Sequence, residues 1–418
     1  MTDTRPAPVR LDDLAAPQYS DDARATLDFL DDYGRTIALD PARLRERASA
    51  ESGLTAWGDP SFGDRLEVLC RAMREEAGLS AAGAASQYEL LTQLLRNRLA
   101  IEDLIERHPE IESVAIEQPI IICGLPRTGT THLHNLLSAD PALRYLPYWE
   151  SLEPVPREGE EPDGRRARCE MALDHVNTVM PHFVRMHEMT VEHAHEEIQL
   201  LAIDVSGMLL ECIAPMPTWR DHYKATDQTP SYAYLKRVLQ ALTWLRGGDR
   251  WVLKSPQHLE QFRPLLATFP DATFVVTHRD PVAITASTAT MIAYTARMAM
   301  ARPDPVTIGQ YWADRTADLL DACVADRELL PPDRSLDVRL DDFVGDELGT
   351  VERIYEVAGQ PLDGRARAGM AAFVDAHPRG RHGTIVQDLG VLGLDGDRLR
   401  ARNAEYRDRF KVRDEGLR

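Results

Sequence analysis

The chain has no run of about 18 consecutive apolar residues, the length that a helix needs to cross a bilayer. We therefore expect no integral membrane segment. The first residues, MTDTRPAPVRLDDLAAP, also lack the apolar core of a secretory signal. These two absences lead us to expect a cytoplasmic protein.

Cysteine is scarce as well. The five cysteines are isolated from one another, and none forms a CxxC pair. Scattered single cysteines disfavour a zinc knuckle or a dithiol redox motif, and they suit a reducing compartment. No group of histidines and cysteines has the spacing of zinc ligands, so we expect no metal site.

Positive charge is in deficit: 48 Lys and Arg residues stand against 67 Asp and Glu residues, and the formal net charge is -19. A chain of this sign repels phosphate backbones, which argues against a general nucleic-acid binder. Any anionic ligand must therefore be held by a local cluster of cations.

The N-terminal part of the chain has a helical pattern. Apolar residues at three- and four-residue spacing over 63–78 and 86–111 predict two amphipathic helices. From about residue 118 the pattern changes to strands that alternate with helices. We therefore predict an N-terminal helical extension over residues 1–115 and a second domain over residues 116–418.

The second domain has the pattern of an α/β fold. Runs of apolar and β-branched residues predict strands at 119–123, 250–256, 272–278 and 335–343. Helices are predicted from Thr130 and Pro281, and over 191–212, 230–248 and 259–270. This alternation predicts a parallel sheet flanked by helices, in which ligands bind at the carboxyl ends of the strands.

A phosphate-binding loop without its usual lysine follows the first strand, in PIIICGLPRTGTTHLHNLL (119–137). A nucleotide kinase carries lysine directly after the second glycine of this loop, where this chain has Thr130. Backbone N–H groups at a helix N-terminus bind anions without that lysine. Arg127 adds a cation, and the hydroxyl groups of Thr130 and Thr131 add donors, so the loop is predicted to bind an anion.

A second anion site is predicted at the ends of two later strands. Lys254 ends one strand and Arg279 follows the next. Ser287 lies about two turns into the helix that Asp280 and Pro281 begin. A strand-end guanidinium and a hydroxyl on that helix can then share one anion, separate from the loop.

These motifs resemble those of the sulfotransferases that use 3′-phosphoadenosine-5′-phosphosulfate (PAPS). PRTGTT (126–131) is similar to the family's 5′-phosphosulfate loop, although Arg127 stands where many members have lysine. Arg279 with Ser287 resembles the pair that binds the 3′-phosphate. HPRGRHGTIVQDLGV (377–391) is similar to the C-terminal segment that covers the nucleotide in a bacterial branch.

The resemblance implies a P-loop-like fold, PAPS as the donor, 3′-phosphoadenosine-5′-phosphate (PAP) as the product, and no metal. Two cation-lined anion sites take the place of the lysine and magnesium of a kinase. The residues that it implies for donor binding are Arg127, Thr128, Gly129, Thr130, Thr131, Arg279, Ser287, Arg379, Gly380 and Arg381.

Sulfuryl transfer needs cations that stabilise the transferring group and a base that takes the acceptor's proton. We expect Arg127 and Lys254 to be the cations. For the base we expect Glu196 or Glu197, assisted by His195, because these residues lie in the charged stretch EHAHEEIQLLA (192–202).

Two alternatives to this base remain open. If residues 192–202 are helical, His193 shares a face with the two glutamates, and that face is also what a solvated charged surface would have. The second candidate is His258. Other family members carry a histidine just after the strand that bears the lysine, where this chain has Pro256, and His258 is the nearest histidine.

The leading interpretation is a sulfotransferase that moves the sulfuryl group to a hydroxyl of a small molecule, lipid or glycolipid. The alternatives are a P-loop-type kinase and a nucleotide-binding module without turnover. The sequence does not identify the acceptor, and it leaves the oligomeric state open, a homo-oligomer included.

Overall fold

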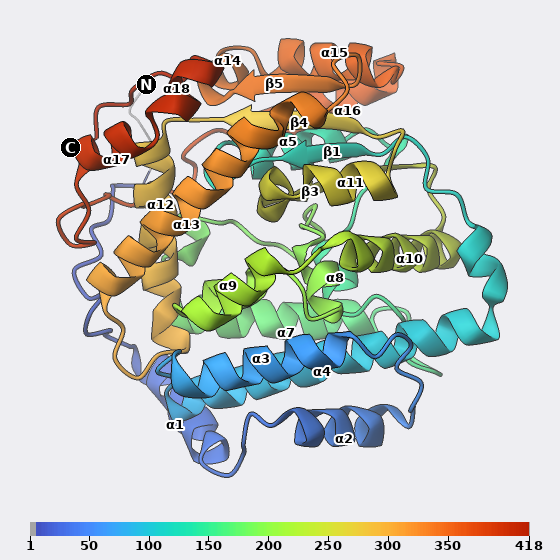
Figure 1. The fold of residues 1–418 in the computed structure, drawn as a ribbon, viewed down its shortest axis with the longest axis vertical. Coiled ribbons are helices and arrows are strands. Elements are labelled where there is room, and N and C mark those ends of the chain that lie inside the picture. Colours follow the sequence, from blue (N-terminus) through green and yellow to red (C-terminus); the bar gives the residue numbers. More distant parts are fainter. Residues whose placement is uncertain (1–5, 418) are drawn as a thin grey trace.

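A parallel sheet lies in the upper half of the molecule as drawn in Figure 1, above the N-terminal helices. The computed structural model describes residues 6–417, and this part of the chain contains one sheet of five strands in the order β2-β3-β1-β4-β5. Every neighbouring pair is parallel. The α/β fold predicted from the sequence is confirmed. The strands are β1 (Ile120–Cys123), β2 (Leu143–Arg144), β3 (Arg250–Ser255), β4 (Thr273–His278) and β5 (Ser335–Arg339).

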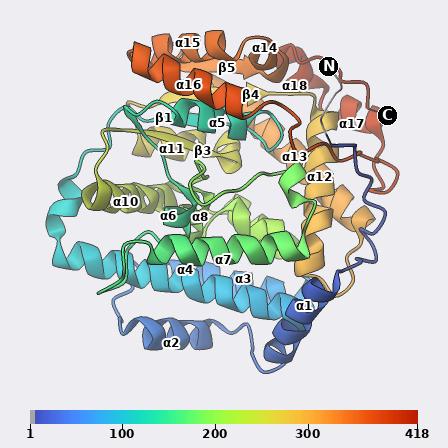
Figure 2. The ribbon, with the colours of Figure 1, turned by 180° about the vertical axis from the view of Figure 1, so that it is seen from behind.

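Strand β1 is buried on both faces because its four residues are all apolar. Ile120 and Ile122 face one core, which α5 (Thr130–Ser138), α15 (Glu347–Ala358) and α16 (Gly364–Ala376) cover. Ile121 and Cys123 face a larger core on the other side. Helices of both layers are visible in Figure 2, where α16 and α5 lie in front of the sheet. The larger core is covered by α10 (Thr229–Arg246), α11 (Phe262–Thr268), α12 (Pro281–Thr295) and α13 (Pro305–Asp326).

The N-terminal helices lie on the side of the molecule away from α15 (Figure 1). The two amphipathic helices predicted there are confirmed as α3 and α4. Leu69 of α3, Leu95 of α4 and Phe274 of β4 belong to one buried cluster, so these helices share a core with the sheet. The division at residue 115 stays a prediction. The helices are α1 (Asp21–Gly34), α2 (Pro41–Ser52), α3 (Phe62–Glu75) and α4 (Ala81–Arg107).

The helix predicted over 191–212 is wrong for its first part, and it is also shorter than predicted, since α8 ends at Ile203 and a 3₁₀ helix follows at Met208–Ile213. Residues 191–195 instead pair with residues 146–149, since His195 N donates to Leu146 O at 2.7 Å and Tyr148 N donates to His193 O at 3.2 Å. The α-helix begins only at Ile198. These backbone bonds satisfy groups that a helix would otherwise pair, so tertiary contacts override the local pattern. His193 and the two glutamates therefore do not share a helix face.

Two further boundaries differ from the prediction. The last strand ends at Arg339, and α14 begins at Leu340. A 3₁₀ turn at Pro256–Glu260 precedes α11. The remaining helices are α6 (Tyr148–Leu152), α7 (Gly164–Val179), α8 (Ile198–Ile203), α9 (Pro217–Ala225), α14 (Leu340–Gly345), α17 (Gly396–Arg402) and α18 (Ala404–Phe410).

A buried charge cluster joins the N-terminal helices to the rest of the fold. Asp204, which follows α8, pairs with Arg98 of α4 at 2.7 Å and with Arg65 of α3 at 2.6 Å. Ser231 of α10 donates to the same carboxylate at 2.7 Å. Arg98 is fully buried. Because each charge is desolvated, the cluster is stable only while both signs are present.

We expect Asp204→Ala to lower the free energy of unfolding by about 3–5 kcal/mol, because it leaves two buried guanidinium groups without their counter-ion. Urea titration of the purified variant measures this loss. Asp103→Ala is the control, because Asp103 pairs with the exposed Arg107 on the same helix α4. That substitution should cost under about 1 kcal/mol. Equal losses in the two variants would show that the buried cluster does not hold the helices.

Candidate functional site

The loop between β1 and α5 is fixed against β4. Thr128 Oγ1 donates to Leu125 O at 2.7 Å and lies 2.6 Å from Thr277 Oγ1 of β4. Gly124 is pressed onto the same hydroxyl, since a Cβ at this position would lie 1.8 Å from Thr277 Oγ1. Thr128 is buried beneath the loop, so its side chain shapes the turn.

Arg127 occupies the left-handed region with φ 72°, which is unusual for a residue with a side chain. Its guanidinium explains how this conformation is held. Nε donates to Ser287 Oγ of α12 at 3.0 Å, and Nη1 donates to Met186 O. Arg279 Nη1 in turn donates to Arg127 O at 2.7 Å. The loop, α12 and the end of β4 are therefore joined through one arginine.

Three arginines from distant parts of the chain share this region. Burial, together with the positive charges of Arg279 and Arg379, lowers the pKa of Arg127 to about 10. Burial is the larger cause, and the charges that act on Arg127 are both positive, with no carboxylate among them. The cluster of Arg127, Arg279 and Arg379 is thus a local excess of positive charge in an acidic protein.

These arginines line one cleft of roughly 830 Å³ at the carboxyl ends of the strands. Of the residues predicted to bind the donor, all except the buried Thr128 line it. The cleft residues from that prediction are Arg127, Gly129, Thr130, Thr131, Arg279, Ser287, Arg379, Gly380 and Arg381.

Aromatic rings lie in the same cleft, and the sequence analysis did not assign them to the site. Phe373 lies 5.3 Å from His132 and stacks on His377 at 4.1 Å, measured between ring centroids. Phe373 lies in the last turn of α16, which no motif marks, and His377 is the C-cap of that helix and the first residue of the segment 377–391. The closeness of Phe373 in sequence to that segment is the one signal that could have pointed to it.

A carboxylate from the C-terminal segment pairs with Arg279. Glu415 Oε1 and Oε2 accept from Arg279 Nε and Nη2, both at 2.6 Å. Glu415 N donates to Asp280 Oδ2 at 2.9 Å. Asp280 also accepts from Val282 N at 3.1 Å, which confirms the predicted cap of α12.

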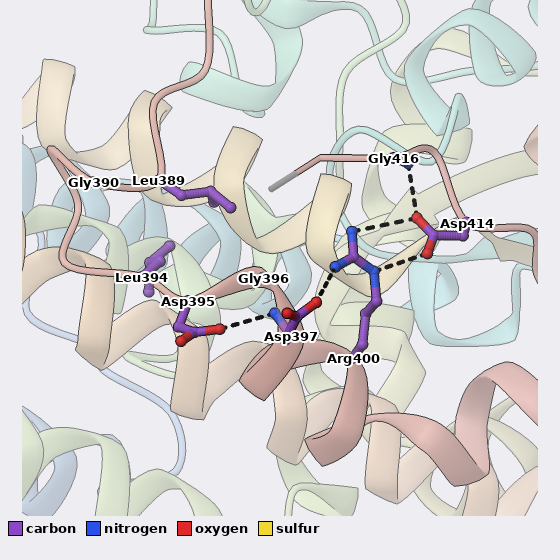
Figure 3. Close-up of a pocket in the computed structure, with 9 residues that line it drawn as sticks. All are labelled: Leu389, Gly390, Leu394, Asp395, Gly396, Asp397, Arg400, Asp414 and Gly416. Atoms are coloured by element: carbon purple, nitrogen blue, oxygen red, sulfur yellow. Dashed lines mark hydrogen bonds and ion pairs between the residues drawn. The ribbon is translucent and has the colours of Figure 1, made fainter.

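The segment that carries Glu415 is held in place by Arg400 of α17. This guanidinium contacts Asp414 at 2.8 Å and Asp397 at 2.9 Å (Figure 3). These residues line a second cavity of roughly 630 Å³ near the C-terminus. Its lining has three aspartates and one arginine, and that arginine is already paired, so this cavity is not suited to an anionic ligand.

The segment 377–391 is held from two sides. Val9 N donates to Thr384 O at 3.0 Å, and Val386 N donates to Val9 O at 2.8 Å. On the other side, Glu188 pairs with Arg381 and lies 3.0 Å from His382. The N-terminal segment around Val9 therefore pairs with residues 384–386 at the edge of the cleft. No sequence motif indicated this contact.

Lys254 lies one residue before the end of β3 and is almost fully buried. Its ammonium pairs with Glu196 and lies 3.4 Å from Thr131 Oγ1. Its backbone N–H donates to Glu197 Oε2 at 2.8 Å. The two glutamates therefore bind different parts of one lysine, the first its charge and the second its backbone.

Glu197 and His258 bind each other in the interior, and neither has exposed surface. His258 Nδ1 lies 2.8 Å from the Tyr232 hydroxyl. Burial acts to raise the pKa of Glu197, but His258 and the Lys254 N–H outweigh it and hold that pKa below its usual value. The geometry gives neither side chain a path to the cleft.

His195 is also buried, and its Nδ1 lies 2.9 Å from His193 Nε2. Burial first, then the charges of neighbouring histidines and Lys254, hold the pKa of His195 well below its usual value. Lys254 therefore meets the loop at Thr131, and Glu196 is the candidate base that contacts the ammonium of this lysine.

A family model described as the sulfotransferase family matches residues 119–364. The chain belongs to this family. The resemblance drawn from the sequence motifs is thereby confirmed.

The solved structures of two mycobacterial sulfotransferases resemble this one over most of their length. Sulfotransferase STF1 from Mycobacterium tuberculosis H37Rv is 31% identical, with a TM-score of 0.77 over 87% of this chain and 98% of its own. Sulfotransferase STF9 from Mycobacterium avium is 27% identical, with a TM-score of 0.81 over 90% of this chain and 98% of its own.

A curated relative is the omega-hydroxy-beta-dihydromenaquinone-9 sulfotransferase Stf3 of Mycobacterium bovis and Mycobacterium tuberculosis. It is 25% identical over 258 residues, which are 59% of this chain. The match spans 64% of the length of these relatives.

Among residues 6–417 of this sulfotransferase, no three His, Cys, Asp or Glu side chains are grouped so that they could hold a metal ion. No helix in the same range is long and apolar enough to cross a membrane.

We expect Gly124→Ala to destabilise the sulfotransferase by about 1–3 kcal/mol, because the new methyl group would overlap the Thr277 hydroxyl. Denaturant unfolding measures the loss. Gly364→Ala is the control, since a Cβ there meets no neighbouring atom. It should change stability by less than about 0.5 kcal/mol. A Gly124→Ala protein as stable as the control variant would contradict the close packing of the loop on β4.

Proposed function

We propose that this sulfotransferase uses PAPS as its donor and transfers the sulfuryl group to a hydroxyl of an apolar small molecule or lipid. The observation that carries the proposal is the convergence of Arg127, Arg279 and Arg379 on one cleft in a chain of net charge -19. A ligand with two separate anionic groups would relieve the repulsion among these cations.

The two anionic groups of the donor have different partners in this proposal. The backbone N–H groups at the start of α5, with the hydroxyls of Thr130 and Thr131, would bind the 5′-phosphosulfate. Arg279 and Ser287 would bind the 3′-phosphate, since both lie beside Arg127. Arg379 and the Gly380 backbone would close over it, and Arg381, paired with Glu188, would fix the covering segment.

The aromatic rings supply the remaining part of a nucleotide site. His132, Phe373 and His377 line the cleft that holds the loop, with their rings in contact with one another. Stacking of an adenine base on such rings is favourable and needs no sequence-specific contact. The proposed donor then spans the cleft from these rings to Arg279.

The reaction forms a bond between the acceptor oxygen and sulfur, breaks the bond between sulfur and the bridging phosphate oxygen, and releases one proton. Lys254 would stabilise the charge that develops on the leaving phosphate, because its ammonium lies beside Thr131. Glu197 and His258 would keep the strand end and its lysine in position. Residues 116–418 would form the catalytic domain, and residues 1–115 would form an extension that covers its larger core.

The acceptor class rests on two supports. The curated relative Stf3 is named for a hydroxylated menaquinone, which is an apolar molecule. The cleft of this chain also has apolar lining from Val184, Met186 and Ile385. A turnover screen with radiolabelled PAPS against hydroxylated lipids, glycolipids and phenols tests the class. Transfer to none of them, with nucleotide binding intact, would favour a module without turnover.

We expect PAP to raise the melting temperature of the protein more than AMP or ATP with magnesium does, because PAP alone fills both anion sites. Arg279→Ala should remove most of this preference, since a charge-assisted hydrogen bond to phosphate is worth about 1.5–3 kcal/mol. Thermal unfolding at matched ligand concentrations measures both effects.

Arg263→Ala is the control for that experiment, because Arg263 is an exposed arginine that pairs with Asp326. It should leave the preference for PAP unchanged. Equal stabilisation by PAP and by ATP with magnesium would instead support a kinase.

We expect Glu415→Gln to tighten PAP binding by roughly two- to fivefold, because it removes a partly exposed carboxylate that competes with the 3′-phosphate for Arg279. Calorimetric titration measures the dissociation constant. AMP, which lacks the 3′-phosphate, should bind the variant and the wild type equally. Glu328→Gln is the matched control, since Glu328 is an exposed carboxylate that pairs with Arg409, and neither residue lines the cleft. Weaker PAP binding in Glu415→Gln would show that Glu415 orients Arg279.

A further inference from the structure

His187 differs from the other histidines of the cleft in its hydrogen bonding. Five histidines line the cleft: His132, His187, His193, His377 and His382. Four of them use a ring nitrogen in a hydrogen bond within the protein, with Glu347, with Thr190 and His195, with Phe373 O, and with Glu188 respectively. Over residues 6–417, neither ring nitrogen of His187 has such a partner, and only its backbone N–H is bonded, to Phe183 O at 2.8 Å.

The backbone on both sides of His187 is fixed. Met186 O accepts from Arg127 Nη1, which ties the preceding residue to the loop. Glu188 pairs with Arg381 and His382, which ties the following residue to the covering segment. His187 is therefore presented between the loop and the segment that closes the cleft.

The charges around His187 keep its imidazole neutral. Burial comes first, and then Lys254, His193 and Arg127 add positive charge; together they lower the pKa of His187 to about 3. Glu188, the next residue in the chain, has its carboxylate paired with Arg381. At neutral pH the imidazole therefore keeps a free lone pair, in the cleft that Arg127 also lines.

The other groups considered for the base are less suited to take a proton. Glu197 and His258 are buried and bind each other. Glu196 is in contact with the Lys254 ammonium, so its carboxylate is already engaged. None of these three lines the cleft, whereas His187 does.

We propose that His187 is the general base of the reaction and accepts the proton of the acceptor hydroxyl. As the acceptor oxygen bonds to sulfur and the sulfur–phosphate oxygen bond breaks, the proton moves to a ring nitrogen of His187. It passes to solvent after the products leave. This inference rests on the proposed function, because it assumes a sulfuryl donor in the same cleft.

The position of His187 also couples its basicity to donor binding. The phosphosulfate carries negative charge to Arg127 and Lys254, and so offsets the positive field that keeps the imidazole from accepting a proton. The pKa of His187 should therefore rise when the nucleotide binds. A residue with a purely structural role would not show this change.

Nuclear magnetic resonance of the histidine ring nitrogens tests the proposal without knowledge of the acceptor. We expect the pKa of His187 to rise by about one unit or more on saturation with PAP. The resonance is assigned by its loss in His187→Gln. His222 of α9 is the internal reference, because its neighbours Arg65, Arg71 and Asp64 lie outside the cleft. A His187 pKa that PAP leaves unchanged would overturn the proposal.

The kinetic arm measures release of labelled sulfate from PAPS with water as the acceptor, and transfer to any acceptor that the screen returns. His187→Gln should lower both rates by roughly 100-fold and leave the PAP dissociation constant within about twofold. His193→Gln, whose ring is bonded on both sides, should cost less than about tenfold.

The outcomes separate the two proposals. If the wild-type protein does not bind PAP, the proposed donor is wrong and the inference falls with it. If PAP binds but His187→Gln keeps its rate while Glu196→Gln loses it, the base is Glu196 and only the inference is overturned. Loss of PAP affinity in His187→Gln would also overturn it, because His187 would then bind the donor.

Discussion

Repulsion among Arg127, Arg279 and Arg379 is the constraint around which the cleft is built. A chain with a large excess of carboxylates could have neutralised these cations from all sides. Instead, Arg127 is satisfied by neutral oxygens, from Ser287 and Met186, which hold the guanidinium without cancelling its charge. Among residues 6–417, Arg279 alone of the three has a carboxylate partner, which comes from the C-terminal segment. The charge of the site is thus preserved by the choice of partners.

A second, buried set of contacts keeps the lysine end of the cleft in place. His258 bonds Glu197 through one ring nitrogen and Tyr232 through the other, and Glu197 accepts from the backbone N–H of Lys254. A fully buried glutamate is tolerated there because each of its oxygens has a partner. The adjacent Glu196 meets the same lysine from the other side. The two consecutive glutamates therefore have different roles. Glu197 binds His258 and the Lys254 backbone in the interior, whereas Glu196 binds the Lys254 ammonium.

The parts of the site that local chemistry determines could be predicted from the sequence. The apolar strand, the glycines and the helix start of the loop lie within twenty or so residues of one another, and their spacing alone indicates an anion-binding turn. Arg279 and Ser287 share one strand–helix unit, so their proximity followed from helix geometry. β1 is the middle strand of the sheet and is buried on both faces, as its purely apolar sequence indicates.

The remaining features depend on contacts between distant segments. The helix expected at 191–195 is absent because the chain pairs with residues 146–149 there, which no local pattern reveals. The Glu415 carboxylate and the free ring of His187 are likewise defined by neighbours far away in sequence. The histidines and glutamates of EHAHEEIQLLA (192–202) give the same sequence pattern whether they are exposed or buried, so the sequence could not rank them as bases.

The backbone pairing between Val9 and residues 384–386 has a consequence for the order in which the chain folds during synthesis. The neighbouring pair, Arg10 with Asp388, joins positions 378 residues apart. The N-terminal segment leaves the ribosome first and must wait for almost the whole chain before its partner is available. Contacts of such separation form late, since the intervening chain must be ordered before they are gained. The wall of the cleft is therefore among the last parts of the molecule to assemble, and an incomplete chain lacks it.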